Sequence, residues 1–142
     1  MNLGLQNRIA IITGTNNPQG IGAATALAFA NEGVRLALVY KKIPHEYDEI
    51  KTGIDGVDRY FKANSGDMTQ VEEQLNALKA EYLVLESDIS NEQCVKEIFD
   101  HVNGHFGKVD ILVNLQAKRL LKHDKRMKRL SFVNTISQSK RH

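Results

Sequence analysis

Cysteine, tryptophan and proline are scarce in this sequence of 142 residues. Cys94 is the sole cysteine, two prolines and no tryptophan are present, and aromatic residues make up 6%. One cysteine cannot form a disulfide within the chain, so we interpret Cys94 as structural and predict a cytoplasmic location. No apolar run reaches the roughly 18 residues of a membrane span, and the first residues do not form a signal-peptide pattern. With 42% hydrophobic and 25% charged residues, the composition is typical of one soluble globular domain.

Glycine, proline and acidic residues are nearly absent from the last part of the chain. All ten glycines and both prolines precede residue 108. Residues 1–110 contain 10 basic and 16 acidic side chains, a net charge of −6, whereas residues 111–142 contain 9 basic side chains and only Asp124, a net charge of +8. So abrupt a shift predicts a boundary, which we set between a domain at 1–114 and a basic tail at 115–142.

The first 114 residues alternate between strand and helix patterns. Strands are predicted at Arg8–Thr13, Val34–Tyr40, Tyr82–Glu86 and Val109–Asn114. Helices are predicted at Gly20–Asn31, at Asp67–Ala80 with Asp67 as a cap, and after a capping box that runs from Ser90 to Gln93. Their expected apolar stripes are Ile21, Ala24, Ala28 and Phe29, then Val71, Leu75 and Leu78, then Val95, Ile98, Phe99, Val102 and Phe106. The pattern indicates an α/β fold, the first half of a Rossmann-like doubly wound parallel sheet with strand order 3-2-1-4.

A glycine-rich loop joins the first predicted strand to the first predicted helix. Gly14 permits a tight turn at the end of the strand, and Gly20 lets the backbone approach a phosphate. Gly22 allows the helix to pack closely on the sheet, and the helix N-terminus offers free N–H groups to a pyrophosphate. A glycine pattern that follows a strand and opens a helix predicts a dinucleotide site, while a plain turn in another α/β protein is the alternative.

Three motifs in order resemble the short-chain dehydrogenase/reductase family over roughly residues 5–114. They are residues 8–22, the Ser87-Asp88-Ile89 segment, and the segment from Asp110 to Asn114. The five residues between Gly14 and Gly20 are similar to the enoyl reductase branch, and the Gly-Ile-Gly ending is similar to the ketoreductase branch, so the loop leaves the subgroup open. The resemblance implies an NAD(P)-dependent oxidoreductase of carbonyls or alcohols, most like a 3-oxoacyl carrier-protein reductase. It implies cofactor contacts from Thr13, Gly14, Gly20, Ile21, Gly22, Tyr40, Lys41, Asp88, Ile89 and Asn114.

The end of the second strand bears on the choice between NAD and NADP. An acid there would bind the ribose diol of NAD, and a basic side chain would accept the 2′-phosphate of NADP. Tyr40 stands where family members that prefer NAD carry Asp, and Lys41 and Lys42 follow it. We therefore favour NADP over NAD, with lysines that merely solvate a loop as the alternative. Asp88 stands where the family's aspartate contacts the adenine amino group, or it is a turn residue before Ser90.

The family's catalytic serine and Tyr-x-x-x-Lys pair have no counterpart after the fourth predicted strand. Only Asn114 remains of the family's Asn-Asn-Ala-Gly motif, and the one Tyr-x-x-x-Lys match, Tyr47 to Lys51, lies in the wrong half of the fold. We assign no catalytic residue and hypothesise that residues 115–142 are out of register with the family. A competing hypothesis makes Leu130–Ile136 a displaced fifth strand, with Ser137 or Ser139 as the serine.

Other features fit less specific interpretations. His101 and His105 have a metal-compatible spacing, but no third ligand is evident, so we predict no metal site. We interpret the basic segment Lys118–Arg129 as solvated rather than as a helix that binds nucleic acid or a membrane. The alternative to an oxidoreductase is a non-catalytic nucleotide-binding or interaction fragment whose basic tail binds anions. We also expect self-association through the fourth strand, because an uncovered strand edge can pair with another copy.

Overall fold

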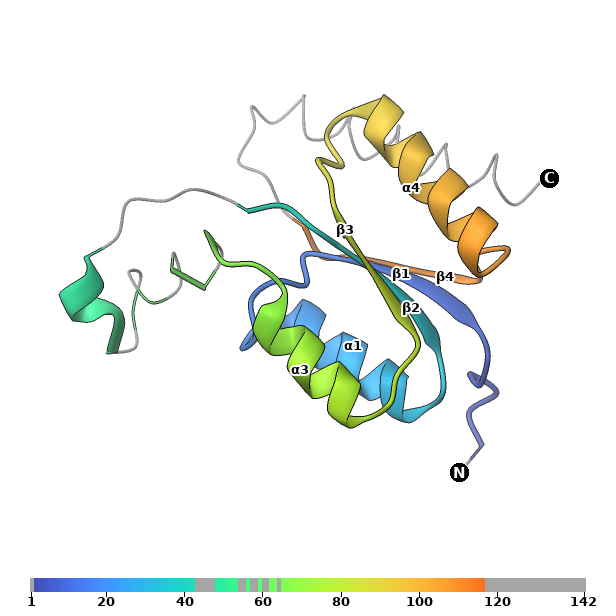
Figure 1. Ribbon diagram of the computed structural model, residues 1–142, viewed down its shortest axis with the longest axis horizontal. Helices are drawn as coiled ribbons and strands as arrows, with labels where there is room; N and C mark the ends of the chain where they lie inside the picture. The colour runs from blue at the N-terminus through green and yellow to red at the C-terminus, as the bar shows by residue number, and fades with distance from the viewer. Residues whose placement is uncertain are drawn as a thin grey trace.

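A parallel sheet of four strands forms the centre of the computed structural model, which describes residues 2–42, 48–53, 56, 59, 62–63 and 65–116. The strands are β1 (Ile9–Thr13), β2 (Arg35–Tyr40), β3 (Tyr82–Glu86) and β4 (Ile111–Asn114). Their order in the sheet is β3-β2-β1-β4, which confirms the predicted half of a doubly wound fold. Helices α1 (Ile21–Asn31) and α3 (Thr69–Ala77) cover one face, and α4 (Glu92–His105) covers the other (Figure 1).

Alternate residues of β1 face the two layers of helices. Ala10 and Ile12 pack with α1 and α3 in one cluster, and Ile9 and Ile11 pack with α4 in the other. All five residues of β1 are buried, as expected for a central strand of a parallel sheet with helices on both sides. The near-continuous apolar strands of the sequence therefore reflect burial on both faces.

The buried face of α1 differs from the predicted stripe. Ile21 is 75% exposed and Ala24 and Ala28 are exposed as well, whereas the helix buries Gly22, Ala23 and Ala26 against the sheet. A Cβ on Gly22 would overlap the carbonyl oxygen of Gly14, so the helix lies too close to the strand end for a large side chain there. Of the predicted stripe, only Phe29 packs against the core. Close approach selects the smallest residues for the inner face, which helical spacing alone did not indicate.

Helices α3 and α4 follow their predicted stripes with three corrections. The N-cap of α3 is Met68 rather than Asp67, whose Oδ1 accepts a hydrogen bond from the Thr69 N–H at 3.0 Å. Val71 and Leu75 are buried, but Leu78 lies past the end of α3 and is 42% exposed. In α4 the inner face is the predicted one, but the N-cap is Asn91 rather than Ser90. The Asn91 Oδ1 accepts hydrogen bonds from the Gln93 and Cys94 N–H groups, at 2.9 and 3.3 Å. The hydroxyl of Ser90 instead donates to Asp88, which removes Ser90 from the cap.

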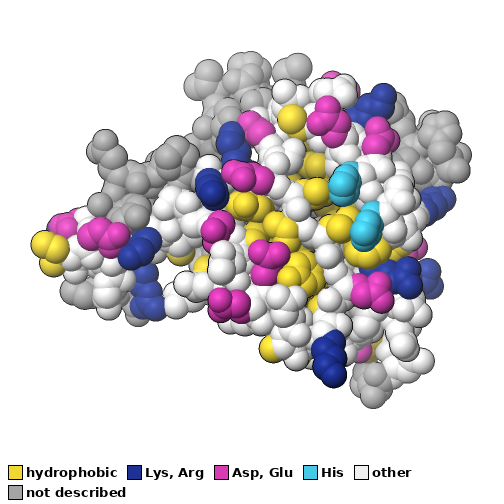
Figure 2. Space-filling model, viewed as in Figure 1, with side chains coloured by type: hydrophobic (Ala, Val, Ile, Leu, Met, Phe, Trp, Pro, Cys, Tyr) yellow, Lys and Arg dark blue, Asp and Glu magenta, His cyan; other side chains and the backbone are white. Residues whose placement is uncertain are grey.

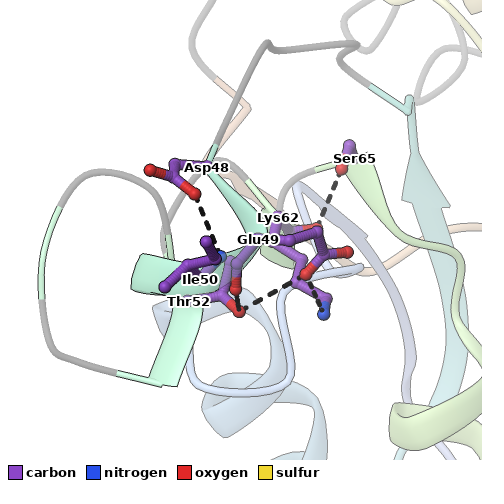
Figure 3. A network of polar contacts seen from close by, with 6 residues as sticks. All are labelled: Asp48, Glu49, Ile50, Thr52, Lys62 and Ser65. Atoms are coloured by element: carbon purple, nitrogen blue, oxygen red, sulfur yellow. Dashed lines mark hydrogen bonds and ion pairs between the residues drawn. The ribbon is translucent and has the colours of Figure 1, made fainter.

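The connection between β2 and α3 is long, and its described part lies to one side of the sheet. Its short 3-10 helix, η1 (Glu49–Gly53), stands apart at the left of Figure 1. Figure 3 shows the polar contacts that hold it, including the Lys62 Nζ to Glu49 Oε2 ion pair at 3.0 Å. Lys51 belongs to η1, but Tyr47 lies outside the described residues, so the Tyr-x-x-x-Lys match in this segment is not placed.

Several predictions concern residues 117–142, which lie outside the described part of the chain. They are the basic tail, its segment Lys118–Arg129, and the displaced strand Leu130–Ile136 with Ser137 and Ser139. The boundary after residue 114 likewise stays a prediction. Among the helices that the structure describes, none has the length and apolar character needed to cross a membrane.

Candidate dinucleotide-binding site

The carboxyl ends of the four strands meet at one edge of the sheet. The parallel register aligns Thr13 with Val39 and with Asn114, and Tyr40 with Glu86. The residues that follow these strand ends are therefore neighbours in space, although they are up to about a hundred positions apart in the chain. Ligands of open α/β sheets bind in the crevice at this edge. The candidate site is built from the turn after β1 and from the corner formed by the ends of β2 and β3.

Backbone geometry dominates the turn after β1. Gly14 has a φ of +74°, a left-handed conformation that favours glycine, and its N–H donates to the Val39 carbonyl oxygen at 2.9 Å. A Cβ on Gly20 would lie 3.2 Å from the carbonyl oxygen of Asn17. Position 20 is thus closely packed by the loop itself, a constraint that the sequence interpretation did not contain.

The N-terminus of α1 is prepared differently from that of α4. The N-cap of α1 is Gly20, without a side-chain cap, and the first turn holds no acid. Helix α4, by contrast, has the Asn91 cap and Glu92 in its first turn. The first N–H groups of a helix have no partner within the helix and carry partial positive charge. In α1 these groups have neither a side-chain cap nor an acid beside them, which fits the negative charge of a pyrophosphate.

Thr13 joins the ends of β1 and β4. Its side chain is completely buried, and its hydroxyl donates to the Asn114 Oδ1 at 2.7 Å. The Thr13 Oγ1 itself accepts hydrogen bonds from the N–H groups of Leu115 and Gln116, at 3.0 and 3.1 Å. A threonine hydroxyl offers one donor and two acceptor positions, so these contacts use all of its capacity. Thr13 therefore holds the exit of β4 beside the turn. Its expected contact with the cofactor stays a prediction.

An acidic side chain from β3 lies at the end of β2, where the sequence of β2 itself has none. Glu86, the last residue of β3, pairs with Tyr40, and the Tyr40 hydroxyl donates to the Glu86 Oε2 at 3.4 Å. Burial raises the pKa of Tyr40, and the neighbouring charge of Glu86 raises it further. The corner is therefore not purely basic, because an acid reaches it from the adjacent strand.

Lys41 and Asp88 form an ion pair across the same corner. The Lys41 Nζ lies 2.8 Å from the Asp88 Oδ2, and the two side chains are 35% and 31% exposed. The other carboxylate oxygen of Asp88 accepts from the Ser90 N–H at 2.9 Å and from the Ser90 hydroxyl at 2.6 Å. Burial raises the pKa of Asp88, but the hydrogen bonds from Lys41 and Ser90 outweigh that effect and hold the pKa well below its usual range.

The remaining expected contact residues differ in exposure. Ile21 is strongly exposed on the first turn of α1, and Asn114 is exposed at the end of β4. Ile89 is partly buried and packs against the core under α4. The expected contact of each of these residues with a cofactor stays a prediction.

Sequence reasoning missed the link between the glycine loop and the segment before α3. The Asn16 Nδ2 donates to the Gly66 carbonyl oxygen at 2.9 Å, and the buried Thr15 hydroxyl lies 3.3 Å from the sulfur of Met68. All three side chains, Thr15, Asn16 and Met68, are buried. The extra length of the loop between Gly14 and Gly20 was the only sequence signal, and it did not identify the partner segment.

A comparison with protein-family models decides the classification. The model of the short chain dehydrogenases matches residues 52–137, which is more than half of the chain. This chain belongs to the short-chain dehydrogenase family. The matched range includes β3, α4 and β4 and continues past Asn114, beyond the span over which we expected the resemblance.

Relatives in the family differ in the cofactor that their names record. The chain is 27% identical to the NADPH-dependent aldehyde reductase 1 of Arabidopsis thaliana, over 81% of this chain and 34% of the relative. It is 27% identical to the human 15-hydroxyprostaglandin dehydrogenase [NAD(+)], over 94% of this chain and 42% of the relative. The chain thus spans well under half of the length of these curated relatives.

A solved structure of the family has the same arrangement. A short chain dehydrogenase from Burkholderia cenocepacia, in complex with NADP, superposes with a TM-score of 0.66 and 26% identity, over 97% of this chain and 51% of that protein. The short-chain dehydrogenases bind NAD(P), and the relatives named here include an NADPH-dependent protein and an NAD(+)-dependent one.

Metal-binding groups are a separate question. In the part of the chain that the structure describes, no group of three or more His, Cys, Asp or Glu side chains could hold a metal ion. His101 and His105 are both exposed on α4 (Figure 2), and the ring of His105 makes an edge contact with Phe106 at 4.8 Å between centroids.

Proposed function

We propose that this chain supplies the dinucleotide-binding part of an NAD(P)-dependent short-chain oxidoreductase. The observation that carries the proposal is the N-terminus of α1, which has neither a side-chain cap nor an acid and follows the glycine turn at the carboxyl edge of the sheet. The pyrophosphate would lie against Gly20, Ile21 and Gly22. Asn114 and the exit of β4, held by Thr13, would border the middle of the cofactor.

NADP is the proposed preference over NAD. Lys41 follows the end of β2, where a basic side chain accepts a 2′-phosphate, and no acid stands in β2 itself. Asp88 would contact the adenine amino group, with Tyr40 and Ile89 beside the adenosine. The preference is modest in this proposal, because Glu86 and Asp88 bring negative charge to the same corner.

The whole protein is proposed to transfer hydride between the nicotinamide and a carbonyl or alcohol, as a 3-oxoacyl or related carbonyl reductase would. The printed sequence contains no serine with Tyr-x-x-x-Lys after β4 in the family's arrangement, so we propose no catalytic residue within it. A non-catalytic nucleotide-binding fragment is the competing proposal. Steady oxidation of NADPH with a panel of ketones and acyl thioesters would favour the enzyme, and binding without turnover would favour the fragment.

An acid placed at the helix N-terminus tests the proposed pyrophosphate site. Ile21 is the first residue of α1 and its side chain is exposed, so Ile21→Glu should fold and even gain some helix stability from the dipole. The added charge should weaken NADPH binding by about tenfold or more, through repulsion of the pyrophosphate. Ile21→Gln is the matched control, of similar size but neutral. Equal NADPH affinity of both variants in a fluorescence titration would refute the site.

We also propose that copies of the chain associate through β4. Among the described residues, β4 pairs only with β1 and so lies at one edge of the sheet, and its residues Ile111, Leu112 and Val113 are only partly buried. An open strand edge presents unpaired N–H and C=O groups to a second copy. Sedimentation velocity over a range of concentrations should reveal dimers or larger species. A monomer at every concentration would contradict the proposal.

The cytoplasmic location stays a prediction from cysteine content.

A further inference from the structure

Each lysine after β2 is opposed by an acid from a later segment of the chain. Lys41 is ion-paired with Asp88, which follows β3. Hydrogen bonds from Thr69 hold the pKa of Asp67 below its ordinary value, and the charge of Lys42 adds to that effect. Glu86 lies beside Tyr40 at the same corner. The positive charge of Lys41 is therefore largely compensated before any ligand binds.

The Lys41–Asp88 pair is the tightest of these compensations. Its atoms are 2.8 Å apart, and about two thirds of each side chain is shielded from solvent, so screening by water is incomplete. Asp88 is held in place by two hydrogen bonds from Ser90. A fixed carboxylate next to the ammonium group favours a fixed position of Lys41. A phosphate that approached the same ammonium group would come close to the carboxylate and be repelled by it.

We propose that Asp88 is a specificity-determining residue, which lowers the preference of the site for a 2′-phosphorylated adenosine by competing with that phosphate for the ammonium group of Lys41. The inference rests on the proposed dinucleotide site and adds to it a role for Asp88 apart from any contact with the base. Asp88 then sets the ratio of the affinities for NADP and NAD.

Two nucleotides that differ only in the 2′-phosphate measure this ratio. Adenosine 5′-monophosphate and adenosine 2′,5′-bisphosphate carry the same base, so a lost contact between Asp88 and adenine weakens both and cancels in the ratio. Calorimetry on the full chain gives both affinities. Asp88→Asn retains an oxygen for Ser90 and removes the charge. We expect this variant to raise the preference for the bisphosphate by about threefold to tenfold.

Matched variants distinguish the effect of the Lys41–Asp88 ion pair from the effect of removing any one negative charge. Asp100→Asn removes one negative charge from the exposed face of α4 and should leave the ratio unchanged. In a Lys41→Gln background, Asp88→Asn should change the ratio no more than Asp100→Asn does. Thermal melts establish that each variant is folded. If Asp88→Asn does not fold, Lys41→Gln alone decides, because a compensated lysine should contribute less than about tenfold to the ratio.

The outcomes distinguish this inference from the proposed function. If neither nucleotide binds the folded wild-type chain, the dinucleotide site itself is wrong, and the inference falls with it. If both bind but Asp88→Asn leaves the ratio unchanged, only the inference is wrong. A fall in the ratio would also overturn it, because Asp88 would then orient Lys41 toward the phosphate instead of competing with it.

Discussion

The turn after β1 and the corner at the ends of β2 and β3 share one edge of the sheet but are built in different ways. The turn depends on backbone shape, with the left-handed Gly14 and a contact at Gly22 that leaves no room for a Cβ. The corner depends on charged side chains that are partly exposed, above all Lys41 and Asp88. Steric overlap in a packed turn can be removed only by moving the backbone, which costs stability. The interaction of a partly exposed charge, in contrast, is weakened by solvent screening. The turn should therefore be intolerant of change, and the corner should be adjustable.

The largest effect is expected from Gly22→Ala. The added Cβ would meet the Gly14 carbonyl oxygen, which is backbone and cannot rotate away, so α1 must move off the sheet. We expect a loss of about 3 kcal/mol or more in the free energy of unfolding. Gly104→Ala is the control, since it lies in α4 with nothing within 4 Å of its Cβ, and it should stabilise the chain by up to about 1 kcal/mol. Equal effects of the two variants in urea denaturation would show that close packing at Gly22 does not matter.

Thr13→Val tests the link from the same turn to β4. The change keeps the shape of a completely buried side chain but leaves the Leu115 and Gln116 N–H groups without their acceptor. We expect a destabilisation of about 1–3 kcal/mol in urea denaturation. Thr25→Val removes a hydroxyl that bonds only within α1, to the Ile21 carbonyl oxygen, and should cost less than about 1 kcal/mol. A smaller effect at Thr13 than at Thr25 would contradict the role assigned to Thr13.

Low pH should remove the stabilisation that the charged Asp88 gives to the corner. The folded pKa of Asp88 lies below its ordinary value of 3.8, so its carboxylate stabilises the fold above that pH. This stabilisation is lost as the pH falls through 3.8 toward the lower folded pKa. At neutral pH the free energy of unfolding of the wild type should exceed that of Asp88→Asn by up to about 1 kcal/mol. This difference should shrink below about pH 4. Urea denaturation at several pH values measures it, and a difference that grows in acid would reverse the assigned sign.

Tyr40→Phe should have the smallest effect. The hydroxyl of Tyr40 makes a long hydrogen bond of 3.4 Å to Glu86, whose carboxylate is exposed and can be solvated by water instead. We expect a change in the free energy of unfolding of less than about 0.5 kcal/mol. A change as large as that for Thr13→Val would mean that the corner is as rigidly built as the turn.

Local sequence signals predicted the elements of this fold well, and their contacts less well. The four strands and three helices lie where apolar periodicity and glycine placed them, because short apolar runs and helical spacing are local properties. Three of the four residues predicted for the inner face of α1 are exposed and only Phe29 packs inward, because the packing distance of the helix depends on the backbone of the preceding turn. The cap of α4 was displaced by one residue, because Asp88 engages the hydroxyl of Ser90.

The sequence by itself determined the strand–glycine turn–helix unit and, through it, the edge of the sheet where a dinucleotide would bind. That unit is encoded by Gly14, Gly20 and Gly22 within nine consecutive positions, so no distant residue is needed to recognise it. Only the tertiary structure decided which charges face one another at the end of β2. Lys41 and Asp88 are 47 positions apart in the sequence, and Tyr40 and Glu86 are 46 positions apart. Parallel pairing of β2 with β3 aligns the ends of these strands, and that pairing joins side chains that no local pattern connects.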